Sequence, residues 1–187
     1  AAIGTVADVA PIVGENRAIV RLGLAGIRAG ARPGIAALLA RANVAPAAVD
    51  VETLSFAIAP RLNAAGRVGE AMDAARLLLA STPEVAAALA ATLEAANLER
   101  RDLTKQAVAE ARISPDAVDG AAATIVRGPW PVGVVGLVAA RLAEERGRPA
   151  IVGADMGDVV RASCRGDGAL HLADALAACD DLLIRHG

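Results

Sequence analysis

After Pro83 the chain runs to about Arg112 without a glycine or a further proline, and this stretch limits most strongly how it can fold. The two hydroxyl residues before Pro83 and the acid after it are typical of a helix start. Apolar side chains lie roughly along one face, at Val85, Leu89, Leu93, Ala96, Leu103 and Val108. We therefore expect one helix of about 30 residues, about 45 Å long at ~1.5 Å per residue. In a chain of 187 residues, such a helix is typical of a connection between two domains.

Shorter elements are expected on both sides of this helix. Before it, apolar spacing predicts helices over 15–28, from Pro33 onward and over 70–80. Between them, Thr53 can cap a short helix that Pro60 interrupts, and a loop follows over 61–67. After it, we expect strands over 122–126, 149–153 and 159–165, and helices over 132–146 and 170–184. The order β-α-β-β-α predicts a small α/β domain.

Composition excludes several classes of protein. Aromatic residues make up 1% of the chain, so a core must be built from Ala, Val, Leu and Ile. No apolar run reaches the roughly 18–20 residues that span a bilayer, and we expect a cytoplasmic protein without a membrane partner. The net charge of −2 excludes a chain that is basic throughout. Of 19 basic residues only Lys105 is a lysine, which reflects either GC-rich codon usage or bidentate phosphate recognition by arginine.

The first candidate motif is GTVADVAP, residues 4–11, where one acid, Asp8, stands among small and apolar residues. We expect a strand end followed by a turn, the place where open α/β sheets hold ligand-binding groups. Metal-assisted phosphoryl chemistry needs several acids or histidines around its ions. We therefore expect Asp8 to be one metal ligand of a site whose other ligands lie upstream of this sequence.

Three further motifs are rich in glycine and arginine. APRLNAAGR, residues 59–67, can aim guanidinium and amide groups at phosphates, or can be a surface loop with a helix-capping Asn63. In GPWPVGVVGLVAARL, residues 128–142, Gly133 and Gly136 open a helix whose backbone N–H groups can bind an anion, although tight packing also explains glycines there. In RASCRG, residues 161–166, side chains of alternate residues share one side of a strand, which gives either a phosphate grip or a solvated charged face.

These four motifs resemble, in order along nearly the whole chain, the RecJ family of the DHH phosphoesterase superfamily. Residues 4–11 are similar to its fourth metal-site motif, and GENR, residues 14–17, follows as in the family. Residues 59–67 are close to the family's diagnostic string, 131–142 to its His-Pro-Gly-Val-Val-Gly stretch, and 161–166 to its Gly-Ser-x-Arg-Ser motif. Pro131 stands at the family's histidine, so no contact of that histidine is carried over.

The resemblance implies an α/β fold in three parts. Residues 1–80 would be the end of a DHH-type parallel-sheet domain, 81–115 the interdomain helix and 119–187 most of a small α/β DHH-associated domain. The implied activity is 5′→3′ exonuclease degradation of single-stranded DNA in repair and recombination, by two-metal hydrolysis with Mn²⁺ or Mg²⁺. The implied partners are single-stranded DNA, single-stranded-DNA-binding protein and a helicase.

The resemblance also implies roles for single residues. Asp8 would bind a metal ion, Ser163 and Arg165 would hold the DNA 5′-phosphate, and Arg61, Asn63 and Arg67 would contact the strand; Asn16, Arg17 and Gly133 are further candidates. The family's other metal motifs are expected before Ala1, so we expect this chain alone to be inactive. Two alternatives stay open: a DHH phosphoesterase acting on short oligoribonucleotides or cyclic dinucleotides, and a non-catalytic nucleic-acid-binding fragment.

Overall fold

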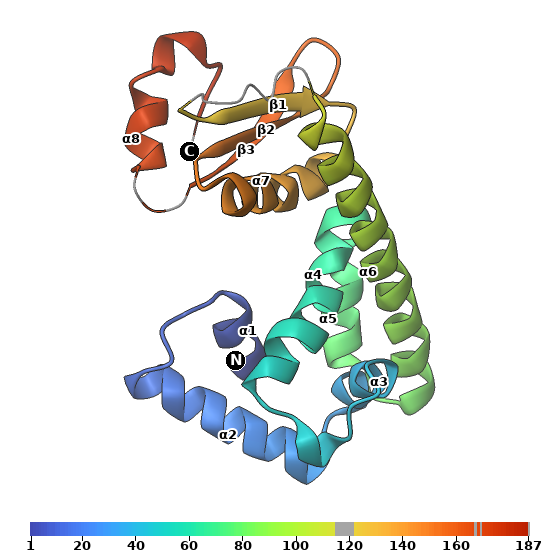
Figure 1. The fold of residues 1–187 in the computed structure, drawn as a ribbon. Helices are drawn as coiled ribbons and strands as arrows, with labels where there is room; N and C mark the ends of the chain where they lie inside the picture. The colour runs from blue at the N-terminus through green and yellow to red at the C-terminus, as the bar shows by residue number, and fades with distance from the viewer. Residues whose placement is uncertain (115–121, 167, 169, 187) are drawn as a thin grey trace. The chain divides into compact units, whose positions relative to one another are not determined.

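The computed structural model describes residues 1–114, 122–166, 168 and 170–186. The chain divides into two compact units, Ala1–Arg100 (unit 1) and Arg101–Gly187 (unit 2), and the boundary falls inside one long helix (Figure 1). Unit 1 is helical, while unit 2 contains a three-stranded sheet, so the α/β class is confirmed. Among the helices of the described residues, none is both long and apolar enough to cross a membrane.

The helices of unit 1 begin and end largely where local signals predict. They are α1 (Ala2–Ala7), α2 (Gly14–Gly30), α3 (Pro33–Arg41), α4 (Ala59–Val68), α5 (Ala71–Leu79) and the start of α6 (Pro83–Arg112). A 3₁₀ turn, η1 (Pro46–Ala48), and a π-helical segment, η2 (Thr53–Ile58), lie between α3 and α4. Prolines open α3 and α6 because the first helical turn needs no backbone donor there. The predictions for α2, α3, α5 and the 30-residue α6 are confirmed.

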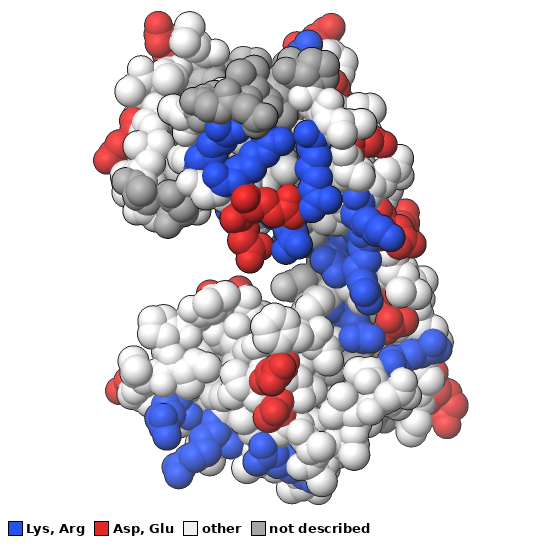
Figure 2. Space-filling view, viewed as in Figure 1, with Lys and Arg blue, Asp and Glu red and all other residues white. Residues whose placement is uncertain are grey.

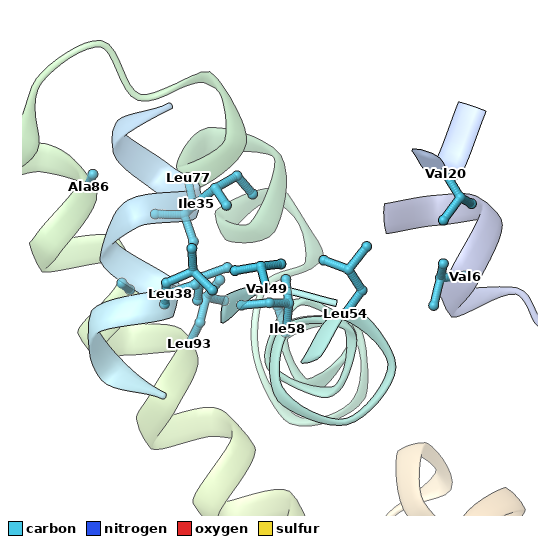
Figure 3. Close-up of a cluster of buried hydrophobic side chains, with 13 residues drawn as sticks. Val6, Val20, Ile35, Leu38, Val49, Leu54, Ile58, Leu77, Ala86 and Leu93 are labelled. Carbon is cyan, nitrogen blue, oxygen red and sulfur yellow. The ribbon is translucent and has the colours of Figure 1, made fainter. Parts of the chain in front are cut away.

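The core of unit 1 is aliphatic, as composition requires. Leu38 from α3, Ile58 from η2 and Leu77 from α5 are each 0% exposed, and Leu93 of α6 packs into the same cluster (Figure 3). Burying one such side chain contributes about 1.5–3 kcal/mol. The single phenylalanine, Phe56, is 78% exposed and takes no part in this core.

The buried face of α6 differs from the predicted one by about one position. Val85 is 52% exposed, whereas Ala86 is fully buried. In unit 1 the buried residues of α6 are small except for one leucine: Ala86, Ala90, Leu93 and Asn97. Alanine is a strong helix former and lets a neighbouring helix approach closely, so the face with small side chains is the one that packs.

The segment around Asp8 is a helix end, and the predicted strand end is wrong. Ala2–Ala7 form α1, and Asp8 is its C-terminal capping residue. Ala2 and Val6 are four positions apart and both buried, while Gly4 between them is exposed. Strand alternation would put all three on one side, so this burial pattern fits the helical period and not a strand. The chain then turns through Val9, whose φ of 55° is rare for a β-branched residue.

The predicted loop over 61–67 is also wrong, because these residues belong to α4. The helix starts before Thr53: the Asp50 carboxylate accepts from the Thr53 N–H at 2.7 Å and caps it. Pro60 does not interrupt the helix, since it follows the π-helical turn η2 and falls in the first turn of α4. Proline has no backbone N–H to donate within a helix, and the wider π-helical turn before Pro60 changes the hydrogen-bond pattern so that none is required from it. Asn63 therefore lies inside a helix and does not cap one.

Unit 2 is built on a mixed three-stranded sheet in the order β1-β2-β3. Strands β1 (Thr124–Gly128) and β2 (Ala150–Asp155) are parallel, and β3 (Val160–Arg165) runs antiparallel to β2. Helix α7 (Val132–Arg146) connects the parallel pair and packs on one face of the sheet (Figure 1). Gly147 ends α7 with a φ of 58°, the left-handed conformation that favours glycine. The predicted order and the bounds of α7 are confirmed.

The last predicted helix is much shorter than expected. Helix α8 covers Leu172–Ala177, and after it only a 3₁₀ turn, η3 (Asp180–Leu182), forms within the predicted range. Asp180 and Asp181 stand at the start of η3, shortly after α8 ends. Their negative charges would be unfavourable near the C-terminal end of a longer helix, where the helix dipole is also negative. Leu182 and Ile184 are 78% and 88% exposed, so the described residues give this segment no core contact that would stabilise a helix.

Candidate functional site

Ser163 and Arg165 lie on β3 with their side chains on the face of the sheet that α7 covers. In the antiparallel register Ser163 is opposite Val152 and Arg165 is opposite Ala150. Residues directly opposite in a ladder point to the same side, and both β2 partners are fully buried in the cluster that contains the α7 side chains. The prediction that Ser163 and Arg165 lie on the same side of a strand is therefore confirmed.

The two side chains lie next to each other at the edge of this face. One guanidinium nitrogen of Arg165, Nη1, donates to the Ser163 hydroxyl at 3.2 Å and to the Cys164 carbonyl at 2.7 Å. Arg165 is exposed and Ser163 is half-buried, so the pair can be reached from solvent. A hydroxyl and a guanidinium placed together are suited to bind one phosphate group through several charge-assisted hydrogen bonds.

Helix α7 approaches this pair through a glycine. A Cβ added to Gly136 would lie 3.1 Å from the Ser163 hydroxyl oxygen and 3.4 Å from Arg165 Nη2. Gly133, the other glycine that the sequence marks, is the second residue of α7. The N-terminus of α7 has no side-chain cap from its N-cap residue Pro131, which occupies the position of the family's histidine.

Trp130 holds the loop that leads into α7. Its indole N–H donates to Glu110 of α6 at 2.7 Å, and the residue is 8% exposed. A Cβ on Gly128 would lie 2.8 Å from the indole ring, so the glycine makes room for it. This packing of Trp130 fixes where α7 begins.

Cys164 lies between the two candidate phosphate ligands in sequence but on the opposite face of the sheet. Burial raises the pKa of its thiol, and the nearby Arg165 opposes this effect only in part. The thiol is therefore less prone to ionise than an ordinary cysteine, which gives it no advantage as a nucleophile.

Arg61 in unit 1 is held by protein groups. Its Nε and Nη2 pair with the two carboxylate oxygens of Glu94 on α6, the latter at 3.2 Å, and Nη1 donates to the Ala57 carbonyl at 2.7 Å. The side chains of Arg61 and Glu94 are 15% and 17% exposed. This geometry gives Arg61 a role in joining α4 to α6, and its contact with DNA stays a prediction.

Asn63 and Arg67 are both exposed on α4, and they lie four positions apart, on one helical face. Gly66, between them, is exposed as well. A strand of nucleic acid could therefore approach this face without displacing core side chains.

The candidates near Asp8 lie on α2. Asn16 donates from its side-chain amide to the Pro11 carbonyl at 3.0 Å, and so closes the loop that follows Asp8. Arg17 is exposed one residue further on. Asn16 thus acts on the shape of the loop, while Asp8 and Arg17 present charged groups to solvent.

A complete metal centre is not formed by the described residues. They contain no group of three or more His, Cys, Asp or Glu side chains that could hold an ion. Asp8 offers one exposed carboxylate, the oxygen ligand type that Mg²⁺ and Mn²⁺ prefer. One carboxylate fits as a single ligand but does not make a two-metal site.

Charge is distributed differently on the surfaces of the two units. In Figure 2, Lys and Arg side chains gather over the sheet and α7 of unit 2 and continue along α6, with acidic side chains beside them. The face of unit 1 seen there is largely uncharged around α1, with Lys and Arg side chains over α2 and a few acidic side chains between. A positive surface of this kind attracts the phosphates of nucleic acid.

The fold and these residues define a class: a two-unit α/β protein with a helical unit, a 30-residue connecting helix and a mixed-sheet unit in which a serine and an arginine lie side by side on one strand. No family model matches the chain. It is 39% identical over 198 residues to the single-stranded-DNA-specific exonuclease RecJ of Salmonella typhimurium, which covers 100% of the chain and 34% of that protein. RecJ of Bacillus subtilis is 36% identical over 191 residues, covering 100% of the chain and 24% of that protein.

Solved structures give the same result. A crystal structure of Thermus thermophilus RecJ in complex with Mn²⁺ matches with a TM-score of 0.87 and 35% identity, over 100% of the chain and 28% of that protein. A crystal structure of exonuclease RecJ bound to manganese matches with a TM-score of 0.81 and 36% identity, over 100% of the chain and 46% of that protein. The chain is therefore related to RecJ along its whole length, and it spans about a third or less of the length of the two curated relatives. The resemblance seen in the motifs is confirmed.

Two contacts at these sites were not found from the sequence. Glu94 gives no motif signal, because its partner Arg61 is 33 residues away in the chain. Gly136 was marked as a helix-start glycine, but its neighbours Ser163 and Arg165 follow from the packing of α7 on β3.

Proposed function

We propose that this chain contributes a 5′-phosphate grip and one metal ligand to an exonuclease that degrades single-stranded DNA. The observation that carries the proposal is the adjacent placement of Ser163 and Arg165, accessible from solvent, in a chain related to RecJ over its full length. In this proposal 1–80 are the end of a DHH catalytic domain, 81–115 the connecting helix and 119–187 a DHH-associated domain.

Arg165 and Ser163 bind and orient the DNA end. The guanidinium donates to two oxygens of a 5′-phosphate, and the Ser163 hydroxyl donates to the same group. A terminal phosphate carries more negative charge than an internal phosphodiester, so this pair favours the end of a strand over its middle. Holding the end fixes which phosphodiester bond reaches the reacting centre, and it gives the reaction its 5′→3′ direction.

Asp8 binds a divalent cation together with ligands from outside the described residues. Mn²⁺ or Mg²⁺, when bound, supplies an activated water and stabilises the charge that develops on the phosphoryl oxygens. Asp8 itself holds one position of such an ion. Asn16 keeps the loop after it closed through the Pro11 carbonyl, and so limits where the carboxylate can move.

The exposed face of α4 guides the strand. Asn63 and Arg67 contact the sugar-phosphate backbone, and Arg61 supports α4 through Glu94. An exonuclease of this kind would act in the cytoplasm, in DNA repair and recombination, where a helicase and single-stranded-DNA-binding protein supply its substrate.

The test compares substrates with the full-length gene product. With Mn²⁺, we expect nucleotide release from long single-stranded DNA, little from blunt duplex DNA, and none after chelation with EDTA. Faster hydrolysis of dinucleotides or cyclic dinucleotides than of long strands would identify a different phosphoesterase. Tight DNA binding without hydrolysis at any Mn²⁺ or Mg²⁺ concentration would refute the enzymatic proposal.

A further inference from the structure

One glycine of α7, Gly136, lies against two polar side chains, whereas Gly23 and Gly34, also tightly surrounded, lie against an alanine and a leucine. Gly136 lies in the second turn of the 15-residue α7, where glycine weakens a helix relative to alanine. An added Cβ would meet the Ser163 hydroxyl oxygen at 3.1 Å, Arg165 Nη2 at 3.4 Å and the Ser163 Cβ at 3.7 Å. At Gly26 and Gly30 of α2 an added Cβ would meet nothing within 4 Å. The space at Gly136 is thus bounded by the two groups assigned to the phosphate.

From this contact we propose that Gly136 is a positioning residue that sets the preference for a 5′-phosphate, an inference that rests on the proposed function. It acts through Ser163 and Arg165, because the absence of its side chain lets the hydroxyl and the guanidinium stay together on the α7 side of β3. No bond is made or broken by this residue. Gly136 contributes by allowing the Ser163 hydroxyl and the Arg165 guanidinium to stay close to each other.

A methyl group at this position would separate the donors. The contact at 3.1 Å is tighter than a carbon and a hydroxyl oxygen normally allow, so the Ser163 hydroxyl would have to shift by a few tenths of an ångström. The Arg165 guanidinium, at 3.4 Å, would be in ordinary van der Waals contact with the methyl group and could stay in place, so the distance between the two donors would change. Hydrogen bonds to a phosphate oxygen require donor–acceptor distances of about 2.7–3.0 Å from both groups at once. A shift of the Ser163 hydroxyl by a few tenths of an ångström, with Arg165 in place, is comparable to this whole range and weakens the joint contact.

The same methyl group would also lie on the approach to the donors. Glycine permits a ligand to come close to the helix backbone, whereas a side chain holds it away. Both effects act on the phosphate end of the substrate alone. A strand that ends in a 5′-hydroxyl makes no such contact, so its hydrolysis should not depend on Gly136.

The experiment compares Gly136→Ala with the unchanged full-length gene product on matched oligonucleotides that end in a 5′-phosphate or a 5′-hydroxyl. We expect the ratio of kcat/KM for the two substrates to fall about tenfold or more, with the 5′-hydroxyl rate within about twofold. Gly26→Ala is the matched control, because it also adds a methyl group to a helix interior but into open space. The control should leave both rates unchanged. An unchanged ratio in Gly136→Ala would overturn the inference.

A double variant protects the test against a folding defect. Ser163→Ala removes the atom that the methyl group meets at 3.1 Å, so Gly136→Ala should fold in that background. If Gly136 acts through Ser163, the double variant has the same phosphate preference as Ser163→Ala alone. A further large loss in the double variant would contradict this. If the unchanged protein shows no nuclease activity, the proposed function fails; if it prefers the 5′-phosphate and Gly136→Ala does too, only the inference on Gly136 fails.

Discussion

The ion pair between Arg61 and Glu94 offers the clearest test of what the α4 motif does. The Arg61 guanidinium donates three of its five N–H groups to protein acceptors, two to the Glu94 carboxylate and one to the Ala57 carbonyl. Both charged side chains are more than four-fifths buried, at 15% and 17% exposed. We therefore predict that Arg61 stabilises unit 1, and that its removal is costly for folding before it matters for DNA.

The magnitude follows from burial. Removing one partner of a fully buried pair costs about 3–5 kcal/mol, and an exposed pair contributes about 0–1 kcal/mol. With partial solvent access, we expect Arg61→Ala and Glu94→Ala each to lower the free energy of unfolding by about 2–3 kcal/mol. In the double variant no charge is left unpaired, so the loss should be smaller than the sum by about 1–2 kcal/mol.

Urea unfolding of the 187-residue chain, followed by circular dichroism at 222 nm, measures these losses. The single tryptophan, Trp130, lies in unit 2, and its fluorescence should therefore respond less than the helical signal. Asn63→Ala is the control on the same helix, because Asn63 is exposed and should change stability by less than about 0.5 kcal/mol. If the two single variants lowered the free energy of unfolding by less than about 1 kcal/mol each, and additively, the reasoning would be refuted. Arg61 would then be better explained as a residue that contacts DNA.

Three further predictions concern the remaining charged groups. Asp8→Ala in the full-length gene product should abolish turnover while leaving single-stranded-DNA affinity within about twofold, because the exposed carboxylate would bind the metal ion and makes no core contact. A near-normal kcat at low Mn²⁺ would disprove the metal role. Arg165→Ala should reduce kcat/KM on 5′-phosphorylated strands by roughly ten- to a hundredfold, from the loss of about 1.5–3 kcal/mol, and much less on 5′-hydroxyl strands. Equal losses on both substrates would mean that Arg165 contacts the DNA backbone in general and does not recognise the 5′ end. Hydrogen bonds from Trp130 and Gln106 hold the pKa of Glu110 below its ordinary value, so the stabilisation is present above the unfolded-state pKa of about 4.3 and is lost as the pH falls through the lowered value. Trp130→Phe should weaken this acid dependence in urea titrations between about pH 5 and 3, and an unchanged dependence would assign it to other carboxylates.

Local signals were sufficient where one segment carries its own start, stop and period. Helix α6 was predicted to within a residue because its signals are local: a serine and a threonine directly before it, a proline in its first turn and no glycine along its length. Helix α7 was predicted over the bounds that it has, and the structure shows that Gly147 ends it in the left-handed conformation. The strand alternation that places Ser163 and Arg165 on one side is likewise a property of consecutive residues.

Prediction failed where distant residues decide the outcome. The segment 61–67 looks like a loop, yet it is helical, because a π-helical turn accommodates Pro60 and Glu94 pairs with Arg61 from 33 residues away. The end of the chain looks like a long helix, yet it is short, because the described residues offer Leu182 and Ile184 no core to pack on. The segment before Asp8 looked like a strand, yet it is a helix that buries Ala2 and Val6 in the core and leaves Gly4 exposed.

The sequence by itself determined the α/β class, the long helix, the aliphatic core and the relation to RecJ, since each depends on composition or on residues close together in the chain. Only the tertiary structure decided that Arg61 is paired and mostly buried while Asn63 is exposed, and that Gly136 faces Ser163 and Arg165. The physical reason is that hydrogen bonds and van der Waals contacts act over a few ångströms. Which side chains come that close depends on how helices and strands pack, and spacing along the chain does not record it.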